Sequence, residues 1–192
     1  MPTPNPAALD FLLTRRSRPA KTLTAPVPDR PTIETLLTAA ARTPDHGKLE
    51  PWRFIVLEKP ALRRLADLVV KRGTALALDA EAIAKAQAQY ANADLAIAVI
   101  STPKPSEKIP LIEQVYSAGA VCLALVNAAL AAGWGANWLS GWASHDRDFI
   151  RDGLGLADHE SVAGIIHLGT ETSAPPERPR PDLDAITTWV SA

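Results

Sequence analysis

Cysteine is almost absent from this chain of 192 residues, and its histidines show no metal-binding pattern. The single Cys122 excludes an intramolecular disulfide and favours a reducing compartment. Because alanine, valine and leucine surround it, we interpret Cys122 as a packing residue rather than a nucleophile. The histidines form no HExxH motif and have no cysteine pair nearby. We therefore expect no bound metal.

Neither sign of charge dominates, and no hydrophobic run is long enough to predict a membrane span. Lys and Arg number 20 against 21 Asp and Glu, so no basic surplus is left to neutralise a nucleic-acid backbone. The longest apolar stretch, residues 118–134, is interrupted by Asn127 and Gly133, and we expect a buried helix there. Residues 1–6 lack the basic and apolar regions of a signal peptide. We expect a cytoplasmic protein with no nucleic-acid or membrane partner.

Three common catalytic and phosphate-binding motifs are also missing. The sequence has no GxSxG nucleophile turn, no GxxxxGK[ST] phosphate loop, and no GxGxxG between a strand and a helix. These absences argue against a serine hydrolase, a P-loop nucleotidase and a Rossmann dehydrogenase. No acid-base constellation is visible either, so we assign no catalytic side chain.

What remains is ordinary globular composition, with 47% hydrophobic and 21% charged residues and no repeat or linker. We expect one domain over residues 1–192. Capping residues and apolar spacing predict a helix from Asn5 and a second from Asp29 that Pro44 ends. One or two helices are expected over 61–89, broken near Gly73 and Asp79, and others from about 111 to Gly133 and from Asp146 to Gly153. Residues 19–28 are expected to form a loop.

Three segments are rich in β-branched and aromatic residues and are predicted to be strands. They are residues 52–57, 93–100 and 161–169. The second is an almost continuous apolar run, so we place it in the centre of the sheet. Residues 133–138 are expected to form a loop or short strand. The proline-rich tail from 174, with its apolar end, is expected to dock across a partner subunit.

The segment Arg15-Arg16-Ser17-Arg18 is the strongest candidate site. Guanidinium groups and a hydroxyl fit the oxygens of a phosphate. The alternative is a solvated positive helix end that complements the helix dipole. Arg42 and His46 offer a further cation and a ring donor, and their alternative is an ordinary surface role. Trp138, Leu139 and Ser140 offer an aromatic face and a hydroxyl, and their alternative is packing in the core.

Taken in order, these segments resemble the FMN-dependent nitroreductase family, and more narrowly its short, YdjA-type branch. The resemblance rests on Arg15-Arg-Ser17, Arg42-Thr-Pro-Asp-His46, Pro51-Trp-Arg-Phe54, a Ser117-Ala-Gly119 helix start, Gly133-Trp-Gly-Ala-Asn-Trp138 and Leu168-Gly-Thr170. It covers nearly the whole chain, and its strength lies in the shared order of segments.

The resemblance implies an α+β, three-layer fold with a central mixed sheet flanked by helices, and a homodimer with FMN at the interface. It implies that NADPH or NADH reduces the flavin and that nitroaromatic, quinone or similar acceptors reoxidise it by ping-pong hydride transfer. The FMN contacts that it implies are Arg15, Arg16, Ser17, Arg42, His46, Trp138, Leu139 and Ser140. Its implied NADP contacts are Ala128, Ala129, Leu130, Ala131, Ala132 and Gly133.

Two positions depart from the family pattern. Leu139 stands where short-branch members often carry a basic residue, and Pro19 stands where larger members carry one near the flavin N1 and O2. Arg18 is a candidate substitute for the second, and Arg178 and Arg180 are alternative phosphate ligands. A flavin-dependent dehydrogenase or dehalogenase on the same fold, and a non-catalytic FMN-binding module, stay open as alternative functions.

Overall fold

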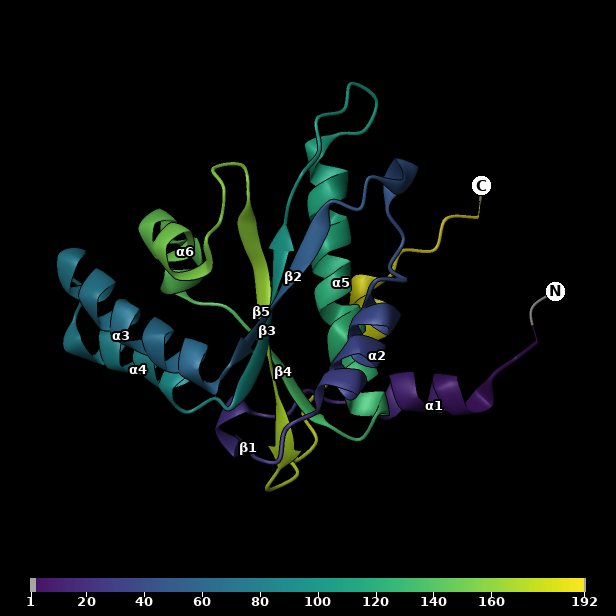
Figure 1. The fold of residues 1–192 in the computed structure, drawn as a ribbon. Helices are drawn as coiled ribbons and strands as arrows, with labels where there is room; N and C mark the ends of the chain where they lie inside the picture. Colours follow the sequence, from purple (N-terminus) through teal and green to yellow (C-terminus); the bar gives the residue numbers. More distant parts are fainter. Residues whose placement is uncertain (1–2, 192) are drawn as a thin grey trace.

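A computed structural model describes residues 3–191, which form a five-stranded sheet between two layers of helices (Figure 1). The strands pair in the order β1-β5-β3-β2, and β4 pairs with β5 as well. Their bounds are β1 (Leu23–Thr24), β2 (Trp52–Glu58), β3 (Leu95–Ser101), β4 (Gly135–Leu139) and β5 (Ser161–Glu171). The strands predicted at 52–57, 93–100 and 161–169 are thereby confirmed, and the fully buried β3 lies inside the sheet as expected.

The predicted mixed sheet is wrong, because every strand pairing within residues 3–191 is antiparallel. The connection between β2 and β3 shows the cause. A helical hairpin joins them, and it returns the chain to the same end of the sheet at which β2 finishes, so that Leu95 lies opposite Glu58. A parallel neighbour would instead need a crossover to the opposite end of the strands.

The helices follow their capping residues. Asn5 accepts a hydrogen bond from the Ala8 amide at 3.1 Å, and Asp29 accepts one from the Thr32 amide at 3.0 Å. The bounds are α1 (Pro6–Thr14), α2 (Arg30–Ala40), α3 (Lys59–Ala75), α4 (Ala80–Ala91), α5 (Leu111–Ala131), α6 (Arg147–Leu154) and α7 (Leu183–Ile186), with 3-10 turns η1 (Ala20–Thr22), η2 (His46–Lys48) and η3 (Trp142–His145).

Several boundaries differ from those predicted. Gly155, with φ of +67°, ends α6, whereas Gly153 lies inside the helix, where a Cβ would come within 2.7 Å of Leu65 Cδ2. The helix α2 ends at Ala40, before Pro44. The helix α5 begins at Leu111 as predicted, so the Ser117 segment that the resemblance places at a helix start lies inside the helix. The predicted loop 19–28 contains η1 and the short strand β1, which pairs with the end of β5.

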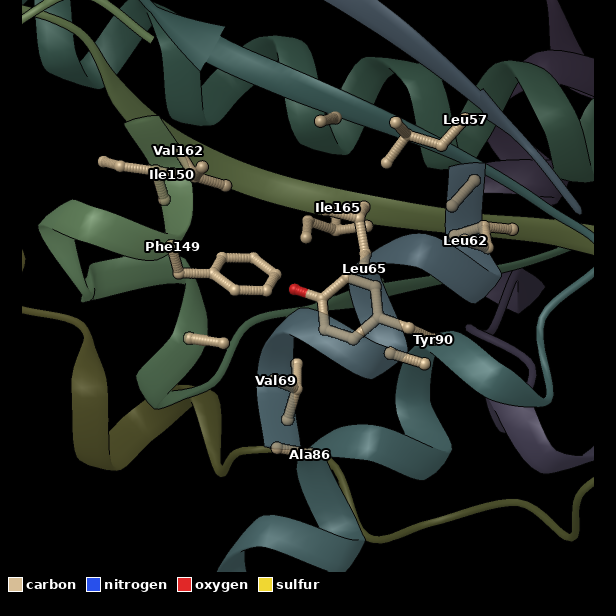
Figure 2. Close-up of a cluster of buried hydrophobic side chains, with 14 of the residues drawn as sticks. Leu57, Leu62, Leu65, Val69, Ala86, Tyr90, Phe149, Ile150, Val162 and Ile165 are labelled. Carbon is tan, nitrogen blue, oxygen red and sulfur yellow. The ribbon is translucent and has the colours of Figure 1, made fainter. Parts of the chain in front are cut away.

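One face of the sheet is covered by α3, α4 and α6, which we call the closed face (Figure 2). Phe149 of α6 meets Tyr90 of α4 with ring centroids 5.5 Å apart, and Leu65 and Val69 of α3 complete the cluster. Burial raises the pKa of Tyr90 to about 12. This side has a complete apolar core within one chain.

The other face is covered by α2 and α5, which we call the open face (Figure 1). Although α5 is long and apolar enough to cross a membrane, one side of it packs against the sheet, as predicted for a buried helix. Cys122 on that side is fully buried, and burial raises its pKa to about 12, in agreement with a packing role. The opposite side of α5 leaves Ile112, Tyr116 and Leu123 exposed.

Candidate functional site

Four arginines converge on one pocket of about 410 Å³ beside β4. Two of them come from the segment that follows α1, and the other two come from the tail more than 150 residues later. The lining residues are Arg15, Arg16, Ser17, Pro19, Asn137, Arg178 and Arg180. The predicted Arg-Arg-Ser site is therefore a pocket, and the tail arginines considered as alternative phosphate ligands lie in the same place.

Backbone hydrogen bonds fix the arginine segment against the sheet. The helix α1 ends at Thr14, and the Arg15 amide donates to Phe11 O at 2.7 Å. Three residues later the Arg18 amide donates to Ala136 O at 2.8 Å, and the Asn137 side-chain amide donates to Arg18 O at 2.6 Å. The chain between these anchors is short, so the side chains of this segment are positioned relative to β4.

The electrostatics of the pocket favour an anion. Arg15 Nε and Arg16 Nη1 are buried and have no hydrogen-bond partner among residues 3–191. Arg15 donates through Nη2 to Ser17 Oγ at 3.1 Å. Burial, and then the positive charges of Arg180 and Arg18, lower the pKa of Arg15. Unpaired buried donors on neighbouring cations are costly unless an anion completes them, and a phosphate has oxygens for several such donors.

Arg18 faces a different partner. Its Nε lies 3.4 Å from Glu171 Oε2 at the end of β5, with both side chains about three-quarters buried. The positive charge of Arg18 is therefore largely compensated within the chain. Of the two cations that could act near the flavin ring, Arg16 is the one with a buried, unpaired nitrogen.

The second predicted segment, Trp138 to Ser140, lies at the end of β4, adjacent to Asn137 in the arginine pocket. The Trp138 indole packs against Gly164 of β5, where any Cβ would clash with the ring. Trp138 stays 39% exposed, and Ser140 is also exposed. Because side chains alternate along a strand, Trp138 points to the side of β4 opposite Asn137 and the half-buried Leu139, so its ring does not line the arginine pocket.

Arg42 and His46 do not line this pocket. His46 lines a separate open groove of about 470 Å³ next to the N-terminal half of α5. Figure 1 shows α1 and β4 at the opposite end of that helix. His46 Nδ1 lies 2.6 Å from Glu113 Oε2, and Arg42 is exposed just after α2. One chain therefore brings together the arginine segment and β4, but it does not bring Arg42 and His46 to them.

The segment Ala128 to Gly133 forms the last turn of α5 and its cap. Gly133, with φ of +83°, ends the helix, and the Trp134 amide donates to Ala129 O at 2.9 Å. Ala129 itself is fully buried, whereas Ala131 to Gly133 are exposed. This turn leads directly into β4, so it lies close in sequence to the aromatic segment.

Sequence reasoning missed Asn137 and Glu113. Asn137 joins β4 to the arginine segment, and its only sequence signal is a polar residue inside an otherwise apolar strand. Glu113 reaches His46 across 67 positions of sequence, and no local pattern indicates that contact.

Relatives of this chain are named for one activity. The sequence model of the Nitroreductase family matches residues 12–170. A protein of Escherichia coli strain K12, named as the NAD(P)H nitroreductase YdjA, is 34% identical over 163 residues, which cover 85% of this chain and 87% of the relative. A Haemophilus influenzae protein named as an NAD(P)H nitroreductase is 36% identical over 165 residues, covering 85% and 88%.

Solved structures share the fold. A nitroreductase-like family protein from Bacillus cereus is similar with a TM-score of 0.76 at 22% identity, and the similarity covers 100% of both chains. A nitroreductase from Desulfovibrio desulfuricans, solved in complex with FMN, is similar with a TM-score of 0.74 at 20% identity, covering 98% of this chain and 99% of the other. From the family match and the identity to its relatives, the chain belongs to the nitroreductase family.

Proposed function

We propose that this protein is an FMN-dependent oxidoreductase that takes hydride from NADPH or NADH and passes it to nitroaromatic, quinone or similar electrophilic acceptors. The observation that carries the proposal is the arginine pocket, in which Arg15 Nε and Arg16 Nη1 are buried and have no partner within residues 3–191. FMN carries a phosphate, whose oxygens would accept hydrogen bonds from these donors. Family membership points to the same cofactor and activity.

The residues of the pocket have separate roles in this proposal. Arg15 and Ser17 hold the phosphate, with Arg178 and Arg180 of the tail as further cations. Arg16 lies toward the pyrimidine side of the ring, where a positive charge stabilises the negative charge that reduction adds. Trp138, Leu139 and Ser140 line the ring through β4 and the backbone that follows it.

Bound FMN supplies the hydride chemistry, so the protein needs to supply binding, orientation and access. We therefore assign no side chain as general acid or base. Donor and acceptor are expected to use one open site in turn, which gives ping-pong kinetics. The NADP contact at Ala128 to Gly133 and the cytoplasmic location stay predictions of the same scheme.

The open face supports a homodimer. A single chain leaves large apolar side chains exposed on α1, on α5 and in the tail, and exposed apolar surface of this extent indicates an interface. These residues are Leu9, Leu12, Leu13, Leu111, Ile112, Val115, Tyr116, Leu123, Leu183, Ile186, Trp189 and Val190. A second copy would bury them and, in the proposed assembly, would carry Arg42 and His46 to the arginine pocket.

An absorbance spectrum of the purified protein, followed by anaerobic titration with NADPH and with NADH, tests the cofactor and the donor together. We expect bound flavin that one or both nicotinamides bleach and that a quinone or nitroaromatic reoxidises. Failure to bind added FMN would contradict the proposal. Bound flavin that neither nicotinamide bleaches would instead indicate a non-catalytic FMN-binding module, and reoxidation by a narrow set of other acceptors would indicate a specialised dehydrogenase or dehalogenase.

A further inference from the structure

Glu113, in the first turn of α5, contacts the only predicted flavin-site histidine. The carboxylate Oε2 lies 2.6 Å from His46 Nδ1, although both side chains are about half exposed. An exposed pair of this kind adds little to the stability of a fold. We therefore expect the contact to affect the orientation of the His46 imidazole rather than the stability of the fold.

The loop that carries His46 is fixed independently of Glu113. Ser117, one helical turn further along α5, donates to Pro44 O at 3.0 Å and accepts a hydrogen bond from Trp52 Nε1 at 3.2 Å. On the other side of His46, the Asp45 carboxylate accepts the backbone amides of residues 49 and 50 at 2.9 and 3.0 Å. Because these bonds hold the backbone on both sides, Glu113 is left to determine how the side chain of His46 lies.

The chemistry of the contact determines which ring nitrogen faces outward. An ionised carboxylate only accepts hydrogen bonds, so Nδ1 must carry the proton that it shares with Glu113. The second nitrogen, Nε2, lies on the other side of the ring and is left to contact a ligand. Figure 1 places this turn beside the upper part of α5, on the open face where the second copy is proposed to pack.

We propose that Glu113 is a positioning residue that holds His46 with Nε2 directed to the FMN site of the second copy. The inference rests on the proposed function and adds a residue that acts on the flavin only through His46. It also explains why a carboxylate is placed beside an exposed histidine in a groove that Tyr116 and Ser117 line.

The binding test compares five variants with the wild type by FMN titration of the flavin-free dimer. Removing one hydrogen bond of about 1 kcal/mol predicts that Glu113→Ala weakens FMN binding about fivefold. Glu113→Gln, whose amide oxygen still accepts from Nδ1, should stay within about twofold of the wild type. In Glu113→Ala/His46→Ala the loss should equal that of His46→Ala alone, since both act through one contact. Glu34→Ala, which breaks the exposed Arg30 pair on α2 at 2.9 Å, is the matched control.

A spectroscopic readout separates positioning from a general structural effect. In ¹⁵N spectra of the flavin-free protein at alkaline pH, His46 should carry its proton on Nδ1, and it should move toward the Nε2–H form in Glu113→Ala. The His46→Ala spectrum assigns the signal. A merely structural role for Glu113 would leave the tautomer unchanged.

The possible results are distinguishable from failure of the proposed function. If the wild-type protein binds no FMN, the proposed function fails and this inference fails with it. If the wild type binds FMN but Glu113→Ala binds it equally well, or keeps the Nδ1–H tautomer, only the positioning role is overturned. Equal losses in Glu113→Gln and Glu113→Ala would also overturn it.

Discussion

The two faces of the sheet differ in how completely one chain buries their apolar side chains. On the closed face, α3, α4 and α6 enclose an apolar core, and bidentate ion pairs fasten its rim. Arg53 binds Glu160 at 2.7 and 2.8 Å, and Arg72 binds Asp146 at 2.7 and 3.1 Å. On the open face, α5 packs one side on the sheet and leaves the other apolar and exposed.

The arginines also differ in whether a carboxylate pairs with them. Arg53 and Arg72 of the closed face are matched by carboxylates, whereas Arg15 and Arg16 beside β4 have buried nitrogens with no partner within residues 3–191. The closed face is complete in one chain, so substitutions there should act on stability. The open face leaves apolar surface exposed, and the pocket beside β4 has unpaired positive charge, so substitutions at these two places should act on assembly and on binding.

The largest expected effect is on the closed face. Phe149 of α6 is fully buried and its ring contacts that of Tyr90. Phe149→Ala should lower the free energy of unfolding by about 3–5 kcal/mol, because apolar burial is lost and a cavity is left. Chemical denaturation measures this. Leu76→Ala, at a position that is 46% exposed at the end of α3, is the control and should change stability by less than about 0.5 kcal/mol. Similar losses in both variants would show that this face is not a tightly packed core.

The next effect depends on pH. Hydrogen bonds from Arg53 lower the pKa of the nearly buried Glu160 to about 2 from 4.5. Its folded-state pKa is depressed, so its contribution is complete above about pH 4.5 and is lost as the pH falls toward 2. Glu160→Gln should therefore cost about 2–3 kcal/mol at neutral pH and progressively less in acid. A difference from the wild type that stays constant down to about pH 3 would contradict this account of the ion pair.

On the binding side, Arg15→Ala should weaken FMN binding by about 1.5–3 kcal/mol, the range for a hydrogen bond to a charged group. The flavin-free variant should be no less stable than the wild type, because Arg15 is desolvated and lies near other positive charges. Fluorescence titration with FMN measures the first effect and thermal unfolding the second. Arg30→Ala, on the exposed side of α2, is the control. Unchanged FMN affinity in Arg15→Ala would remove this residue from the phosphate site.

The smallest predicted change is in dimer dissociation, and it compares one substitution on each face. Leu123→Glu on α5 should raise the dissociation constant of the dimer about tenfold or more, because a carboxylate would be buried in the interface. Val70→Glu, at a position that is 37% exposed on α3, should leave the dimer intact. Sedimentation velocity over a range of concentrations compares them. Equal dissociation in both variants would show that the faces do not differ in assembly.

Local signals predicted much of the fold. The caps at Asn5 and Asp29, the apolar run of β3 and the break between α3 and α4 all depend on neighbouring residues, and all are confirmed. Strand direction could not be obtained this way, because it depends on whether one helix or two return the chain to the sheet. The end of α6 was also mislocated, since two glycines lie within three residues of each other and only the backbone conformation distinguishes them.

The candidate site was predicted unevenly for a similar reason. The Arg-Arg-Ser segment is contiguous, so its chemistry is visible in the sequence. The contribution of Arg178 and Arg180 depends on a tail that returns to the N-terminal segment, and the contact of Glu113 with His46 depends on the packing of a loop on α5. The sequence could not show which of Arg16 and Arg18 is free to contact the flavin, because the answer depends on the position of Glu171 beside Arg18.

The most direct test of the central claim, that the open face is completed by a second copy, is the mass of the flavin-loaded protein in solution at micromolar concentration. Sedimentation velocity with detection at the flavin absorbance reports mass and bound cofactor in one experiment. We expect all bound flavin to sediment with twice the chain mass of 20.5 kDa and one FMN per chain. Flavin that sediments with a single chain of 20.5 kDa would show that one copy completes the site and would contradict the account.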